Sequence, residues 1–178
     1  YPGEQGGTAV ADVLFGDYNP AGRLPLTYYK SLDELPPFDD YDITKGRTYK
    51  YFKGEVLYPF GYGLSYSSFT YSDLKVKDEV NKVIVSFRLK NTGKKNGDEV
   101  TQVYVRIPET GAVIPIKELK GFQRVPLRSG ESRLVEIALD KEQLRYWDAK
   151  LGQFIVPKGA FDIMVGASSK DIRLQTVI

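Results

Sequence analysis

From about residue 67 onward, apolar and polar residues alternate in short runs that are separated by turn-forming residues. The run at 82–90 is the clearest, because Val83, Val85, Phe87 and Leu89 fall on one face of an extended chain. Such runs recur at intervals of roughly 8–12 residues, which is typical of a β-sandwich. We expect about eight strands, over residues 70–76, 82–90, 100–107, 118–125, 131–139, 153–156, 161–166 and 172–177, with a helical turn at 141–144.

The first 30 residues have a different texture. Apolar residues at positions 9, 10, 13 and 14 predict a short helix over 8–15, and Gly16 is placed as its C-terminal glycine. A turn at 17–22 precedes an extended stretch at 23–28, which Pro25 marks as an edge strand. One helix and one strand cannot bury a core, so we expect this stretch to be the last piece of a larger α/β domain. Because the chain starts at Tyr1 without a signal peptide, we also expect it to begin inside a longer polypeptide.

Residues 31–66 have no clean period, yet they include nine Phe and Tyr side chains. A flexible linker would be rich in Gly and Ser. Aromatic side chains at this density need a surface to pack on, so the sequence predicts an ordered aromatic linker, with Gly61 and Gly63 allowing a tight backbone path. The aromatic residues between Tyr49 and Tyr66 could instead stack on sugar rings, which we consider the less frequent use of such residues.

Two absences exclude much chemistry. The sequence has no Cys, which excludes disulfides and thiolate sites, and no His, which excludes histidine triads and histidine zinc sites. The formal net charge of +2 is scattered, so no basic face favours nucleic acid or an anionic membrane. No apolar run approaches the roughly 18 residues of a membrane span. We expect no cofactor and no metal.

Three stretches together resemble glycoside hydrolase family 3. Residues 2–25, with the motif Phe15-Gly16-Asp17-Tyr18-Asn19-Pro20-Ala21-Gly22-Arg23, look like the end of the family's α/β sandwich domain. Residues 46–49 and 58–66 are similar to its linker, and residues 67–178 to its fibronectin-III-like domain, an immunoglobulin-like sandwich. The resemblance implies three parts: an α/β remnant at 1–30, a linker at 31–66 and the sandwich at 67–178. Within the family, residues 41–54 favour β-xylosidase-like over β-glucosidase-like members.

The resemblance also implies a function for the parent enzyme. It would be a retaining β-glycosidase that hydrolyses terminal β-linked sugars with two carboxylates ~5–5.5 Å apart. In the family, both carboxylates lie upstream, in a barrel and in the α/β domain, and neither motif occurs in this chain. We therefore expect no catalytic residue here and no activity of the chain alone. The family habit implies a periplasmic or extracellular location.

Four features could be mistaken for a site. Glu4 is a carboxylate in a glycine-rich loop, which we interpret as a helix-terminal acid. The glycines around it, at positions 3, 6 and 7, lack the spacing of a phosphate loop. Arg47 could orient a substrate hydroxyl or pair with a nearby Asp. Trp147, beside Asp148, is expected in the core or at the rim of the sandwich; an exposed Trp there would favour sugar binding.

Three functions remain open from the residues. The chain is an accessory region that stabilises catalytic domains and shapes the rim of their site, a free-standing carbohydrate-binding sandwich, or a structural interaction domain. The helix and strand at 1–29 favour the first, because a free-standing module has no use for half of another domain. Binding residues cannot be assigned from the sequence.

Overall fold

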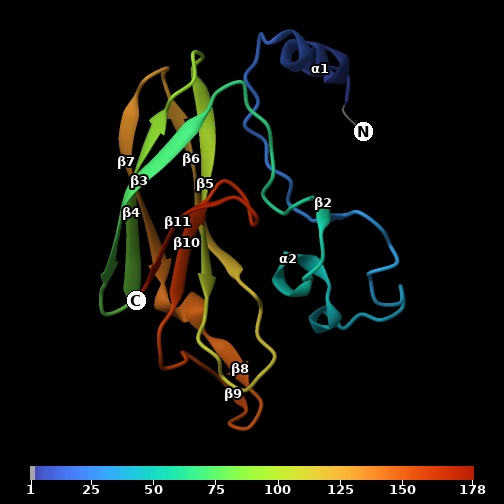
Figure 1. The fold of residues 1–178 in the computed structure, drawn as a ribbon, viewed down its shortest axis with the longest axis vertical. Coiled ribbons are helices and arrows are strands. Elements are labelled where there is room, and N and C mark those ends of the chain that lie inside the picture. The colour runs from blue at the N-terminus through green and yellow to red at the C-terminus, as the bar shows by residue number, and fades with distance from the viewer. Residues whose placement is uncertain (1–2) are drawn as a thin grey trace.

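The structure is a computed structural model that describes residues 3–178, and its C-terminal part is a two-sheet sandwich (Figure 1). One sheet has the order β3-β4-β7 and the other β11-β10-β5-β6, all antiparallel. The strands are β3 (Phe69–Asp78), β4 (Lys82–Asn91), β5 (Gly97–Arg106), β6 (Glu118–Leu127), β7 (Ser132–Asp140), β10 (Asp162–Gly166) and β11 (Ile172–Val177). This arrangement confirms the predicted sandwich.

The core lies between the two sheets and follows the alternation of the sequence. In β4, the four residues Val83, Val85, Phe87 and Leu89 are all buried, while the residues between them are less so. β7 supplies Val135, Ile137 and Leu139 from the neighbouring strand, and β10 and β5 supply apolar residues from the opposite sheet.

Strand β5 departs from this simple pattern. Residues 101–105 are all buried, so both faces of the strand are covered. The inward face carries Val103 and Val105, whereas Gln102 and Tyr104 lie on the outer face of the sheet, outside the core cluster. The less regular alternation of the expected strand at 100–107 therefore has a physical reason, since a second part of the chain covers its outer face.

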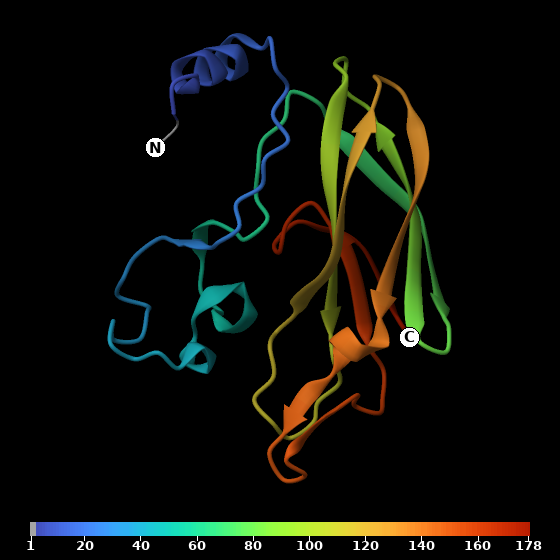
Figure 2. The ribbon, with the colours of Figure 1, turned by 180° about the vertical axis from the view of Figure 1, so that it is seen from behind.

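That second part is the N-terminal third of the chain. Helix α1 (Gly6–Phe15) ends at Gly16, whose φ of 83° is left-handed, as the sequence predicts. Residues 17–27, which form neither helix nor strand, lead to β1 (Tyr28–Tyr29), which pairs with β2 (Val56–Tyr58). Between them lie a 3-10 turn, η1 (Ile43–Lys45), and the one-turn helix α2 (Thr48–Tyr51). In both views α1 stands away from the sandwich, whereas α2 faces it (Figures 1 and 2).

The expected edge strand at 23–28 is wrong for most of its length. Regular pairing is limited to β1, and residues 21–27 form no strand. Instead, the backbone amide of Leu24 donates a hydrogen bond to the carbonyl of Tyr62. The carbonyl of Leu24 accepts one from the amide of Gly61, and both bonds are 2.8 Å long. Pro25 cannot donate a backbone hydrogen bond, so the ladder does not continue through it.

The remaining elements extend one end of the sandwich. The expected helical turn at 141–144 is present as η2 (Lys141–Leu144). It leads into a small hairpin of β8 (Tyr146–Asp148) and β9 (Gln153–Ile155), seen at the lower end of Figure 1.

None of the helices in residues 3–178 has the length and apolar character needed to cross a membrane.

The division of the chain into three parts, with boundaries at residues 30 and 66, remains a prediction.

Candidate interdomain interface

The outer face of β5 is the surface on which the linker lies. Gln102 is 2% exposed, and its Nε2 donates to the carbonyls of Gly61, at 3.1 Å, and Ala167, at 2.7 Å. Its Oε1 accepts a bond from the Tyr104 hydroxyl at 2.5 Å. A single buried amide therefore joins the linker, β5 and the segment after β10, and all its polar atoms have partners, as burial requires.

The two glycines singled out in the linker are confirmed as close-contact positions. Gly61 has a φ of 81°, and a Cβ there would collide with the Gln102 amide. At Gly63, a Cβ would collide with the backbone carbonyl of Gly22. The linker can approach the strand and the N-terminal segment only because both side chains are missing.

An ion pair fixes the N-terminal segment to the same sheet. Arg23 Nη2 lies 2.7 Å from Glu99 Oε1, and the two side chains are only 10% and 6% exposed. The same Oε1 also accepts a bond from the Val100 amide at 2.8 Å. Removing either charge would leave the other buried and uncompensated, which is far more costly than the pair itself is stabilising.

Asn19 is the second anchor of the N-terminal segment. Its Nδ2 donates to Ser67 Oγ at 3.1 Å and to the Asn96 carbonyl at 2.8 Å. Its Oδ1 accepts from Ser65 Oγ at 3.0 Å and from the Tyr66 amide at 2.8 Å. Sequence reasoning placed Asn19 in a turn and missed this role, because its four partners are at least 46 residues away.

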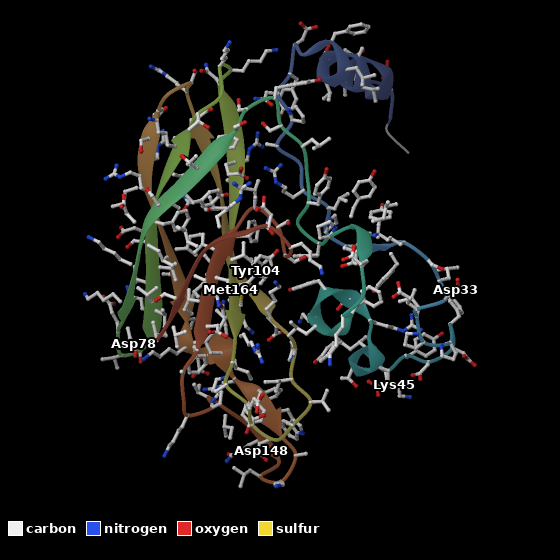
Figure 3. The ribbon with its side chains drawn as sticks, viewed as in Figure 1. Asp33, Lys45, Asp78, Tyr104, Asp148 and Met164 are labelled. Atoms are coloured by element: carbon white, nitrogen blue, oxygen red, sulfur yellow. The ribbon has the colours of Figure 1, made fainter. Side chains whose placement is uncertain are left out.

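Helix α2 forms the third contact, through Tyr49. Its ring stacks on Phe60 with 4.3 Å between the centroids and meets the Tyr104 ring edge-on at 5.9 Å. Its hydroxyl accepts a bond from the Leu119 amide at 3.0 Å, and burial raises the pKa of that hydroxyl. Figure 3 labels Tyr104 together with Met164, its cross-strand partner in β10. The predicted packing of linker aromatics is confirmed for these rings.

A charged cluster lies beside Tyr49. The Glu118 carboxylate, at the start of β6, accepts from Lys50 Nζ at 2.5 Å and from Lys120 Nζ at 2.9 Å. Burial alone would raise the pKa of Glu118, but the hydrogen bonds and charges of the two lysines together outweigh it and lower that pKa overall.

The structure also locates the residues that could have been mistaken for a site. Glu4 is exposed and lies in the turn just before Gln5, the N-cap of α1, so it precedes the first turn of the helix. Arg47 pairs with no Asp carboxylate; it donates instead to the backbone carbonyls of Pro36, Pro37 and Asp40, and so holds that loop in place.

Trp147 is not in the core. It is 52% exposed on the β8–β9 hairpin and lies edge-on to Phe154, which is 61% exposed, with 5.1 Å between the centroids. Figure 3 labels its neighbour Asp148 on this hairpin, far below α2 in the view. Across the described part of the chain, no three or more Asp and Glu side chains come together as a metal site.

Several large apolar side chains are exposed to solvent. On α1, Val10, Leu14 and Phe15 are 56%, 70% and 85% exposed. In the linker, Phe38 and Tyr41 are 92% and 85% exposed. These two surfaces lie on the parts of the chain that point away from the sandwich (Figure 2).

The chain matches known proteins over nearly its whole length. Residues 1–66 match the model of the glycosyl hydrolase family 3 C-terminal domain, and residues 99–169 match that of the fibronectin type III-like domain. A xylan 1,4-beta-xylosidase from Xylanibacter ruminicola is 44% identical over 99% of this chain, which covers 21% of that protein. A periplasmic beta-glucosidase from Salmonella typhimurium is 35% identical over 97% of this chain and 24% of its own length.

Solved structures agree with these relatives. The crystal structure of a beta-D-glucoside glucohydrolase from Trichoderma reesei superposes with a TM-score of 0.91 at 32% identity, over 99% of this chain and 29% of that one. Beta-glucosidase 3B from Thermotoga neapolitana gives a TM-score of 0.89 at 35% identity. The chain thus spans about a quarter of the length of these proteins. It belongs to glycosyl hydrolase family 3 and corresponds to the C-terminal region of that family's β-xylosidases and β-glucosidases.

Proposed function

We propose that this region is the accessory C-terminal part of a retaining β-glycosidase, in which it stabilises the catalytic domains and shapes the rim of the active site. The observation that carries the proposal is the uncovered apolar face of α1, with Val10, Leu14 and Phe15. Exposed apolar residues gathered on one element mark an interaction surface. The rest of an α/β domain is the partner that a lone terminal helix of such a domain needs.

The partners that fit are the upstream barrel and α/β domain of the same enzyme. Slightly more than three-quarters of the length of these relatives lies outside the part that this chain covers, which leaves room for both. Phe38 and Tyr41 in the linker supply a second uncovered surface for the same partners. The catalytic pair would come from these upstream domains, and this chain would supply none of it.

The substrate class we propose is a terminal β-linked xyloside. It is supported by the relative named xylan 1,4-beta-xylosidase, whose identity of 44% exceeds the 35% of the Salmonella beta-glucosidase. A location outside the cytoplasm is supported by the latter relative's name, which places it in the periplasm.

The test is assembly with the upstream region of the same polypeptide. The 178-residue chain, mixed with that region, is expected to form a complex that is more heat-stable than the upstream region alone. Leu14→Asp is expected to weaken assembly by about tenfold or more, because it would bury an unpaired carboxylate. Val80→Asp, at a turn residue that is 89% exposed and not on α1, is the matched control. Absence of a complex, or equal effects of the two variants, would contradict the proposal.

A second function has one specific observation in its favour. The exposed pair of Trp147 and Phe154 offers aromatic faces of the kind that bind sugars. If the sandwich is a carbohydrate-binding module, it should be retained on insoluble xylan, and Trp147→Ala should abolish retention. We expect weak or no retention, and clear retention would favour the module.

A further inference from the structure

A pocket of about 240 Å³ lies where the linker meets the sandwich, and the proposed function makes no use of it. The linker contributes Tyr49, Phe52 and Lys53 to its wall. The sandwich contributes Lys117, just before β6, and Lys170, in the turn between β10 and β11. Three lysines from three separate segments therefore surround one hollow.

These lysines lack acidic partners. Within residues 3–178, no carboxylate oxygen lies within 4.0 Å of the ammonium group of Lys53, Lys117 or Lys170. Glu118 follows Lys117 directly, but its two oxygens bind Lys50 and Lys120.

Glu55 is the acid whose charge acts on this region. Its carboxylate binds Lys30 Nζ at 3.0 Å, and that hydrogen bond is the main cause of its lowered pKa, with further contributions from the charges of Lys30 and Lys170. Glu55 therefore interacts with the charge of Lys170 at longer range, but its ion pair is with Lys30 and with none of the three lysines of the pocket.

Lys117 is the least exposed of the three lysines. It is half-buried, and its ammonium lies 6.0 Å from the centroid of the Tyr104 ring. Burial, followed by the charge of Lys170, lowers its pKa. Like charges that line one partly desolvated pocket repel one another, and a bound anion lowers that cost.

Apart from the hydroxyl residues Thr27 and Ser169, the rest of the wall is apolar and aromatic. Tyr49 is fixed by its stack on Phe60, and Phe52 by an edge contact with Tyr29 at 4.9 Å. Val56, Pro59 and Ile116 complete this side. Such a wall favours a ligand that has a carbon skeleton as well as a charge, rather than a bare inorganic ion.

We propose that this pocket binds a monosaccharide-sized sugar acid, with its carboxylate among Lys53, Lys117 and Lys170 and its ring against Tyr49 and Phe52. Each lysine would donate a charge-assisted hydrogen bond to the carboxylate or form a close ion pair with it. None of the uncovered residues Val10, Leu14, Phe15, Phe38 and Tyr41 lines the pocket, so a failure of the proposed assembly would leave this proposal standing.

The test is a titration of the chain with four small molecules: glucuronate, glucose, xylose and sulfate. Glucuronate is expected to bind at least about tenfold more tightly than glucose, since the two differ mainly in the carboxylate, and a hydrogen bond to a charged group has that magnitude. Its affinity should fall as salt is raised. Equal affinity for glucuronate and glucose would overturn the proposal. Sulfate binding as tight as that of glucuronate would overturn the assignment to a sugar acid.

Three variants locate the binding site. Lys117→Met keeps the apolar stem and removes the charge, and it is expected to reduce glucuronate affinity by about tenfold. Lys53→Met and Lys170→Met, at exposed positions, should each reduce it while leaving the melting temperature unchanged. Lys94→Met, at an exposed lysine in the β4–β5 turn, is the control for net charge. If Lys94→Met reduces affinity as much as the pocket variants do, the binding is non-specific and the proposal fails.

Discussion

Arg23, in the N-terminal segment, and Glu99, in β5, meet at a distance of 2.7 Å with almost no solvent contact. Glu99→Gln keeps the shape but leaves the Arg23 charge uncompensated, so we expect a loss of about 3–5 kcal/mol in the free energy of unfolding. Urea denaturation measures this loss. The double variant Arg23→Met with Glu99→Leu should recover most of the stability, and a double variant as unstable as Glu99→Gln would contradict this account.

Gly61 allows a second prediction at the scale of one residue. Gly61→Ala should destabilise the fold by at least about 1–3 kcal/mol, because alanine there is both strained at positive φ and in collision with the Gln102 amide. Gly111→Ala is the matched control: its φ is 76°, and its Cβ would meet nothing within 4 Å. The difference between the two unfolding free energies isolates the collision, and equal values would show that Gln102 moves aside freely.

At the scale of elements, the contact of α2 with β6 should depend on pH. The pKa of Glu118 is lower in the folded chain, so its ion pairs with Lys50 and Lys120 add stability above the ordinary glutamate pKa of 4.5. This contribution is lost as the pH falls below that value. Glu118→Gln should remove this part of the acid sensitivity, measured as the unfolding free energy between neutral and acid pH. An unchanged pH profile would contradict the assignment.

Helix α1 should be the least protected element of the isolated chain. The Tyr66 hydroxyl donates a hydrogen bond to the Val13 carbonyl of the helix, and Lys95 Nζ donates one to the carbonyl of Gly16, just after the helix. Ten residues without a packed apolar face form a marginal helix. We expect its amides to exchange with solvent far faster than those of β4, as measured by hydrogen exchange. Protection equal to that of β4 would show that the helix is stable by itself.

The sequence predicts elements well where the cause of their structure is local. β4 could be predicted because one face of it meets the core and the other meets solvent, which produces clean alternation. β5 could be predicted only roughly, because Gln102 and Tyr104 are buried by a linker some 40 residues away. The same holds for the interface. Gly61 could be recognised as a position of close backbone approach. The partners of Arg23 and Asn19 could not be predicted, because they are far away in the sequence and no local pattern reveals them.

For the whole molecule, we expect no glycosidase activity. The 178-residue chain should hydrolyse neither aryl β-xylosides nor aryl β-glucosides. A retaining mechanism needs two opposed carboxylates, and neither of the two carboxylate motifs of the family occurs in this sequence. Release of the aryl group measures the reaction. Turnover above background that disappears with Glu4→Gln would contradict this prediction and make Glu4 a catalytic residue.

The covered outer face of β5 has a consequence for how this sandwich can be exchanged between proteins. A sandwich cut at residue 67 and joined elsewhere would leave Gln102, Glu99 and Tyr104 without the linker and N-terminal groups that now satisfy them. Recombination that moves the sandwich alone therefore carries a penalty in stability, whereas recombination that also moves residues 19–63 keeps these contacts. The unit that can be transferred with its contacts intact is larger than the sandwich, because it includes the segment 19–63 that packs on β5.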